Sequence, residues 1–255
     1  SRDRVRRNRR VFVDIKPKET VASSPETAPT GAGVDIGQAL SYLTADPRWM
    51  SKVLVIGLVS LVPILGYVVL LGWMREVFER VKAGQKELPD LDFGNQLSKG
   101  LAPLVALVSP MLIIMMVSFI LQLLVIPFGI VAGALGDTDA AAVVNILGGL
   151  LGMGVMFVWF FMMFVLVLVM PELLRRGMRG EMMPILSPRA SIVAIKNNAL
   201  GFVMVLLGGF VFNLISQLGV FLCFVGMFLT MPLAIVGMSH LLAQWDRLVG
   251  DPQAG

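Results

Sequence analysis

The stretch Asp46–Ala83, DPRWMSKVLVIGLVSLVPILGYVVLLGWMREVFERVKA, decides how the rest of this 255-residue chain is laid out. Residues 53–74 of the stretch carry no charge, and Pro63 and Gly66 interrupt the apolar run. The run predicts either one kinked helix that crosses a membrane or a helical hairpin that turns at Pro63 and Gly66. The choice matters because it reverses the side of the membrane on which every later segment lies.

The composition is that of a membrane protein. Hydrophobic residues make up 56% of the chain and charged residues only 15%, and the mean hydropathy is +0.82. Further charge-free blocks cover residues 100–136, 140–171 and 197–245. A span needs about 20 apolar residues, so the last block is long enough for two. The sequence therefore predicts an all-α polytopic integral membrane protein, with amphipathic interfacial helices beside its transmembrane helices.

The distribution of Lys and Arg favours the hairpin. Of the 21 cationic residues, ten precede residue 53, five lie in residues 75–99, five in residues 175–196 and one in the tail, whereas the loop at residues 136–142 has none. Cytoplasmic loops are enriched in Lys and Arg, and only the hairpin puts all 21 on one side. We therefore expect about six crossings of the cell (inner) membrane with both termini cytoplasmic. A weakness of the hairpin is that about 15 helical residues reach only about 22 Å, which is shorter than the hydrocarbon core of about 30 Å.

Three regions are expected along the chain. Residues 1–33 form a basic arm followed by a linker, SSPETAPTGAG, whose composition is typical of disorder. Residues 34–248 form the transmembrane helical domain, and residues 249–255 form a short tail.

Cationic and aromatic side chains near the ends of the spans are predicted to contact lipid headgroups or to fix the topology. These residues are Arg6, Arg7, Arg9, Arg10, Trp49, Lys52, Arg175 and Arg176. Nucleic acid is not an expected partner, because the arginine-rich arm has no interleaved aromatic residues.

A series of residues before, within and after the charge-free block at residues 53–74 follows the pattern D-P-x-W, P-x-x-G, G, L-P. Its members are Asp46, Pro47, Trp49, Pro63, Gly66, Gly72, Leu88 and Pro89. Together with the later stretches KNNALGFVMVLLGG and GVFLCFVGMFLTMPLAIVGMSHLLAQ, the series resembles the prokaryotic membrane family catalogued as domain of unknown function four thousand and thirteen. The resemblance covers roughly residues 34–245. It implies a six-helix integral membrane protein and no particular biochemical activity.

The residues point away from enzymatic chemistry. No catalytic, cofactor or metal site is predicted, and the apolar blocks contain no Asp, Glu, Lys or Arg of the kind that ion-coupled transport uses. Their polar residues include Gln122, Asn213 and Gln217, and the last two share a helix face. We expect interhelical hydrogen bonds from them, and a polar permeation path is the alternative.

These observations predict a non-enzymatic membrane scaffold or accessory subunit. Its partners would be membrane lipids and either another membrane protein or further copies of the chain. The alternative is a transporter or channel for a neutral or amphipathic solute.

Overall fold

The computed structural model describes residues 33–221 and 226–250, so nearly all of the predicted arm and linker and most of the tail lie outside the described residues. All regular structure within these ranges is helical, which confirms the all-α prediction. In the part of the chain that the structure describes, four helices are long and apolar enough to cross a membrane. They are α4 (Phe93–Leu135), α5 (Asp139–Met178), α7 (Ala199–Phe221) and α8 (Met227–Gly250).

The first apolar block folds as two helices, α2 (Trp49–Val59) and α3 (Leu65–Lys82), with a turn between them. In that turn the backbone of Ile64 has a φ of 65°, and the N–H of Leu65 donates to the carbonyl of Pro63 over 2.7 Å. A Cβ on Gly66 would lie 2.1 Å from the carbonyl oxygen of Val59, so only glycine lets α3 start this close to the end of α2. A single kinked helix is therefore not what forms.

Two short helices have the predicted amphipathic pattern. In α1 (Ile36–Leu43), the side chain of Asp35 caps the N-terminus, and the buried residues Ala39 and Tyr42 lie on the side that packs against α8. Helix α6 (Pro188–Asn197) begins with Pro188, as expected, and follows the 3-10 turn η1 (Pro184–Leu186).

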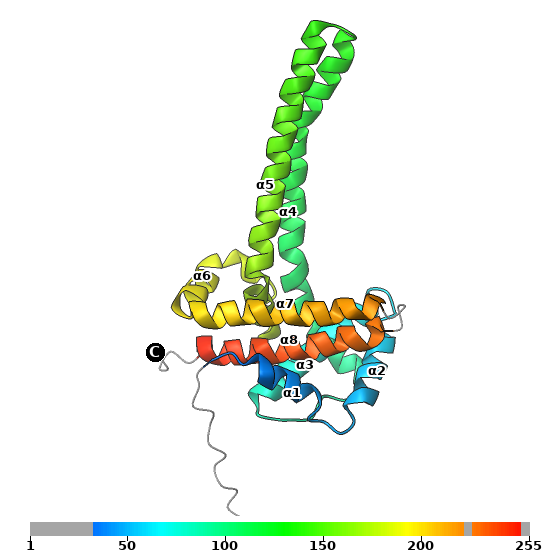
Figure 1. Ribbon diagram of the computed structural model, residues 1–255, viewed down its shortest axis with the longest axis vertical. Coiled ribbons are helices and arrows are strands. Elements are labelled where there is room, and N and C mark those ends of the chain that lie inside the picture. Colours follow the sequence, from blue (N-terminus) through cyan, green and yellow to red (C-terminus); the bar gives the residue numbers. More distant parts are fainter. Residues whose placement is uncertain (1–32, 222–225, 251–255) are drawn as a thin grey trace, which may run out of the picture. The chain divides into compact units, whose positions relative to one another are not determined.

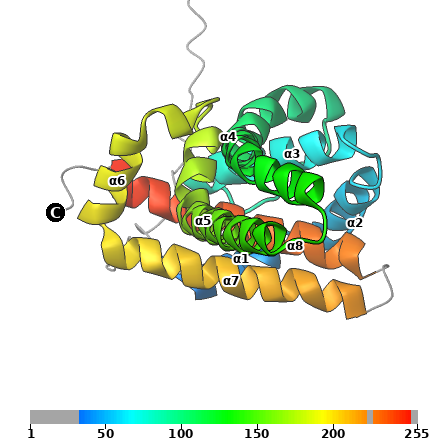
Figure 2. The same cartoon turned by 90° about the horizontal axis from the view of Figure 1, so that it is seen from above.

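Helices α4 and α5 lie side by side along their length as a long hairpin (Figures 1 and 2). Helix α4 continues without a break through Pro103, Pro110 and Pro127. Its 43 residues are about 64 Å long, roughly twice the hydrocarbon thickness of a bilayer. At the tip, Thr138 caps α5 by accepting a hydrogen bond from the N–H of Ala141.

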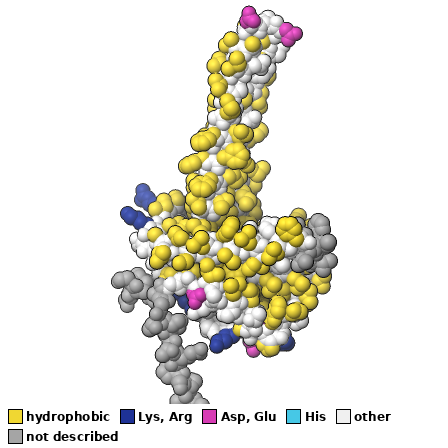
Figure 3. All heavy atoms as spheres, in the orientation of Figure 1, with side chains coloured by type: hydrophobic (Ala, Val, Ile, Leu, Met, Phe, Trp, Pro, Cys, Tyr) yellow, Lys and Arg dark blue, Asp and Glu magenta, His cyan; other side chains and the backbone are white. Residues whose placement is uncertain are grey.

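The inner and outer halves of this hairpin have different surroundings. Up to Ile114, α4 has buried positions that contact α3 or the second half of α5, whereas in residues 115–135 only Ala132 is buried. The surface of the outer half is covered by apolar side chains, with acidic groups at the tip (Figure 3). Its 21 residues in α4 are about 32 Å long, which matches one bilayer crossing.

Helices α3 and α4 cross at an unusually close distance. A Cβ on Gly72 would lie 1.7 Å from the carbonyl oxygen of Gln96, and one on Gly100 would lie 2.0 Å from that of Val68. The two glycines thus bring the two backbones into direct contact, much as small residues do between transmembrane helices.

Helices α7 and α8 pack against each other, and α8 also contacts α1, α2 and α3 (Figure 1). The sequence predicts the turn before α8 near residues 217–219, but in the structure these residues still belong to α7. The core between α3 and α8 is built around Trp73, Phe78 and Trp245.

Candidate functional site at the base of the hairpin

A buried ionic network joins α5 to α8 and α3. The guanidinium of Arg175 makes two hydrogen bonds to the carboxylate of Glu172, over 2.7 and 2.8 Å, and a third, of 2.5 Å, to Oδ1 of Asp246. Trp245 donates to Glu172 over 2.7 Å, and Lys82 of α3 lies 2.5 Å from Asp246. Because donors surround both carboxylates, this cluster is suited to holding helices together rather than to accepting a proton from a substrate.

Arg176, the next residue along α5, holds the segment that leads into α6. Its guanidinium donates to Glu181 and to the carbonyl oxygen of Pro184 over 2.9 Å each. It also reaches the hydroxyls of Ser187 over 2.5 Å and Ser191 over 3.0 Å. One buried side chain therefore fixes η1 and the first turn of α6 against the end of α5.

A second buried ion pair connects the start of α2 to the loop after α3. The carboxylate of Asp46 accepts hydrogen bonds from Lys52 over 2.8 Å and from the N–H groups of Arg48 and Leu88 over 2.7 and 3.0 Å. Lys52 also donates to the carbonyl of Leu88, and Trp73 donates to that of Pro89. Burial disfavours the charged form of Asp46, but these hydrogen bonds outweigh it and hold the pKa of the carboxyl below its usual value.

This cluster explains part of the residue series that carried the family resemblance. Asp46 from the D-P-x-W part and Leu88 from the L-P part lie in direct contact, although 42 residues separate them. Pro47 precedes α2 without starting it, since the helix begins at Trp49 and Asp46 does not act as its N-cap.

An apolar groove lies between the base of the α4–α5 hairpin and α6, with a cavity volume of about 460 Å³. We call it the base groove. The residues that line it include Pro110, Ile114, Leu166, Val169, Ile192 and Ile195. Its walls expose almost only carbon, because the hydroxyl of Ser191 is held by Arg176. Such a surface suits hydrocarbon and offers no group for chemistry.

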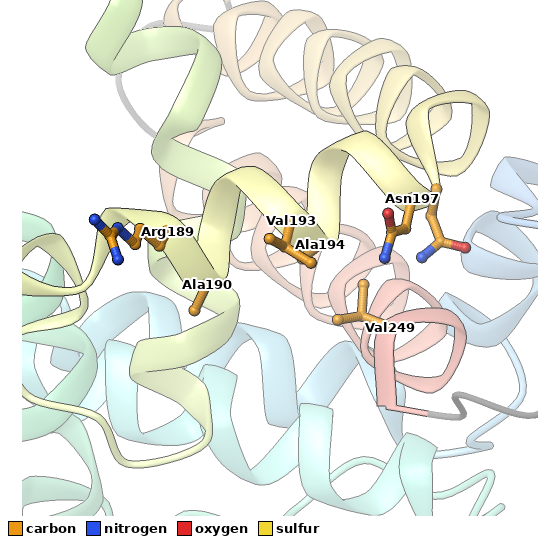
Figure 4. Close-up of a pocket in the computed structure, with 7 residues that line it drawn as sticks. Arg189, Ala190, Val193, Ala194, Asn197 and Val249 are labelled. Carbon is orange, nitrogen blue, oxygen red and sulfur yellow. The ribbon is translucent and has the colours of Figure 1, made fainter.

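A second hollow, of about 410 Å³, lies on another side of α6 (Figure 4). Val193 and Ala194 point toward Val249 of α8 there, and Arg189 projects at the start of the helix (Figure 4). Helix α6 thus has hollows on two of its sides, and the cation at its beginning is exposed.

The predicted headgroup residues have different surroundings from those expected. Arg6, Arg7, Arg9 and Arg10 lie outside the described residues. Trp49 is half-buried against the core. The side chains of Lys52, Arg175 and Arg176 are 4–7% exposed and bonded inside the protein. Within the described residues these three cations therefore bond to the protein itself, and the headgroup or topology role stays a prediction.

The predicted intramembrane polar residues do not come together in one place. Gln122 is exposed on the outer half of α4, and Asn213 and Gln217 are exposed on α7. Asn145 is exposed on α5. None of the four lines either hollow of α6.

Glu172, the most buried charged residue that the structure describes, was not predicted as part of a site. It stands three residues before Arg175, a spacing that pairs side chains on a helix. That signal could have been found if the helix had been continued past Pro171, through which α5 runs without a break. Nothing in the local sequence links them to Asp246, 71 residues beyond Arg175.

Comparison with known proteins places the chain in a family without assigning an activity. No curated protein and no solved structure matches it. A family model described as "Protein of unknown function (DUF4013)" matches residues 55–239, which confirms the resemblance seen in the sequence. The chain belongs to the DUF4013 family.

Proposed function

We propose that this protein is a non-enzymatic membrane scaffold or accessory subunit, which binds lipid and a partner helix through its apolar surfaces. The observation that carries the proposal is the pair of carboxamide side chains, Gln122 and Asn145, exposed on the outer half of the α4–α5 hairpin. A side-chain amide that faces hydrocarbon without a hydrogen-bond partner costs free energy, so such residues favour association with another helix.

The two carboxamides share one side of the hairpin. Helix α4 turns Val125 and Phe128 toward Gly152 and Gly148 of α5. At about 100° per residue, Gln122 points about a quarter turn away from the direction in which α4 faces α5. Asn145 is turned in the same rotational sense from the direction in which α5 faces α4. Because the two right-handed helices face each other and run in opposite directions, rotations in the same sense turn both side chains toward the same side of the hairpin.

The depth of Gln122 supports a partner in the membrane. It stands 14 residues, about 21 Å, from Gly136 at the tip, which is well inside a hydrocarbon layer of about 30 Å. Gly129 and Gly133 continue the same stripe of α4, and a Cβ on either would meet no atom of the described residues. A second hairpin of this chain, or a helix of another protein, fits such a face because small residues permit close approach.

We further propose that the body of the protein lies on the cytoplasmic side of the cell membrane, with both termini cytoplasmic. All 21 Lys and Arg lie on one side if α4 and α5 cross and α2 and α3 do not. Helices α7 and α8 run across the axis of that hairpin (Figure 1), and they give the same sorting whether they stay with the body or cross as a pair. Six crossings give the same sorting but require α2 to cross with 11 residues, about 17 Å. Cysteine labelling from outside the cell at Asp137→Cys, but not at Lys86→Cys, is the expected result.

Crosslinking in native membranes, followed by mass measurement of the purified complex, tests the partner. We expect a discrete dimer or hetero-complex that Gln122→Leu with Asn145→Leu weakens about tenfold or more. Asn213→Leu, which makes the same change on α7, is the control and should leave the complex intact. A chain that always runs as a monomer would remove the support for a scaffold.

The alternative function, a transporter or channel for a neutral or amphipathic solute, would use Asn213 and Gln217. Flux into proteoliposomes that Asn213→Leu abolishes and Gln122→Leu does not change would favour it.

A further inference from the structure

We propose that the base groove binds one acyl chain of an anionic membrane phospholipid, whose headgroup contacts Arg189 and Lys196. The proposal rests on the membrane placement given above and adds a specific ligand and site to it. It does not depend on Gln122 or on the partner helix, so the two can fail separately.

The size and lining of the groove fit a hydrocarbon chain. Its volume of about 460 Å³ falls within the range of small-molecule sites, about 300–1,000 Å³. Ile114 and Leu166, which line it, mark the level at which the hairpin leaves the rest of the protein. With the hairpin crossing as proposed, that level corresponds to the leaflet nearest the body, so an acyl chain can enter the groove from the bilayer.

Two exposed cations flank the groove. Arg189, Ile192 and Lys196 stand at positions i, i+3 and i+7 of α6, a spacing that puts them along one side of the helix. Ile192 lines the base groove and Arg189 lines the second hollow of α6, so the two cations stand on the side of the helix between the hollows, about 10 Å apart along its axis. Within residues 33–221 and 226–250, neither has an acidic group within 4 Å, unlike Lys52, Arg175 and Arg176.

Charge and depth together select the occupant. The cations lie at the base of the hairpin, the end remote from the acidic tip, where phospholipid headgroups of that leaflet would meet them. A neutral lipid would fill the groove but leave the cations without a counterion, whereas a soluble anion would leave the apolar walls exposed. An anionic phospholipid satisfies both features, and basic side chains beside spans commonly bind such headgroups.

Helix α6, which forms one wall of the base groove, is anchored at its first turn. Arg176 fixes the first turn of α6 through Ser187 and Ser191, while Ile192 and Ile195 beyond it face the groove without polar contacts. The wall is therefore anchored at one end and lined by side chains that adapt to a chain of methylenes.

Native mass spectrometry of the full chain, released from micelles that contain equal phosphatidylglycerol and phosphatidylcholine, tests the headgroup contact. Wild type should retain phosphatidylglycerol roughly tenfold or more over phosphatidylcholine. Arg189→Gln with Lys196→Gln should abolish that preference. Arg48→Gln with Lys86→Gln removes two exposed cations elsewhere and should keep it. Equal retention of the two lipids by wild type, or a loss in the control variant as large as in the test variant, would overturn the proposal.

Photolabelling with a phosphatidylglycerol that carries a diazirine in its acyl chain tests the groove without any substitution. Adducts should concentrate in residues 110–114 and 188–195, and Ile192→Trp, which fills the groove, should remove them. Adducts spread over residues 115–165 in proportion to exposure would mean that lipid only surrounds the hairpin, and the proposal would fall.

Discussion

The indole Nε1 of Trp245 donates a 2.7 Å hydrogen bond to Oε2 of Glu172, which joins the end of α8 to the end of α5 across 73 residues of sequence. Glu172 is fully buried and accepts two further hydrogen bonds from Arg175. This contact fixes the base of a long hairpin to the rest of the helices. Its members can therefore be tested by the stability of the fold.

Replacing Glu172 with Gln should destabilise the protein by about 3–5 kcal/mol, because Arg175 then loses a buried charged partner. Trp245→Phe removes one hydrogen bond to a charged acceptor and should cost about 1.5–3 kcal/mol. The free energy of unfolding in mixed micelles, followed by circular dichroism, measures both. Asp137→Asn at the exposed tip is the control, with an expected change below about 0.5 kcal/mol. An equal effect of all three would show that the network does not hold the helices.

Gly72→Ala should prevent the close crossing of α3 and α4, since the new Cβ would lie 1.7 Å from a backbone oxygen. Neither backbone can move away without opening the core, so we expect a loss of several kcal/mol or no folded protein. Gly154→Ala is the matched control on an exposed helical position with no atom within 4 Å. It should be neutral or stabilising by up to about 1 kcal/mol. Expression and thermal stability in detergent compare the two variants.

Much of the helical layout could be predicted because local chemistry determines it. Asp92 caps α4 and Pro188 is the first residue of α6, and both residue types favour those positions. Long charge-free blocks give α4, α5, α7 and α8 their length. Local chemistry favours a helix that starts at Pro47 with Asp46 as its cap, yet α2 starts at Trp49, because the carboxylate of Asp46 is bonded to Lys52 and Leu88 instead.

The candidate site was harder to predict than the helices. The base groove and the pairing of Arg175 with Asp246 both depend on segments that meet only in three dimensions. The headgroup role assigned to Arg175 and Arg176 followed from their position beside a span, which is a property of sequence. That position could not indicate that each arginine would also be buried and paired with an acidic residue of the protein.

Acid should weaken the contact between Asp46 and Lys52. The pKa of Asp46 is below its usual value in the fold, whereas in the unfolded chain it returns to about 3.9. The carboxylate therefore contributes stability above pH of about 4, and this is lost as the pH falls through the lower, folded pKa. The stability advantage of wild type over Asp46→Asn should be constant between about pH 5 and 7 and shrink below about 4. If the difference in stability between wild type and Asp46→Asn stays unchanged into strong acid, the result would contradict the buried ion pair.

Ile64 is the described non-glycine residue with a positive φ, and its replacement should report on the turn between α2 and α3. Its φ of 65° and ψ of −63° form a strained γ-turn, and such conformations cost about 1–3 kcal/mol. The side chain is 80% exposed, so Ile64→Gly removes little packing and should stabilise the protein by about 0.5–2 kcal/mol, after the entropy that glycine adds to the unfolded chain.

The control for this change is Leu61→Gly, in the same turn but with an ordinary backbone conformation. It should destabilise by about 0.5–1 kcal/mol, because glycine relieves no strain there and adds the same entropy to the unfolded chain. If the unfolding free energy, measured in the same micelles, rises in Ile64→Gly and falls in Leu61→Gly, the chain turns at Ile64. A loss in both would mean that this residue carries no strain, as in a continuous helix through Pro63.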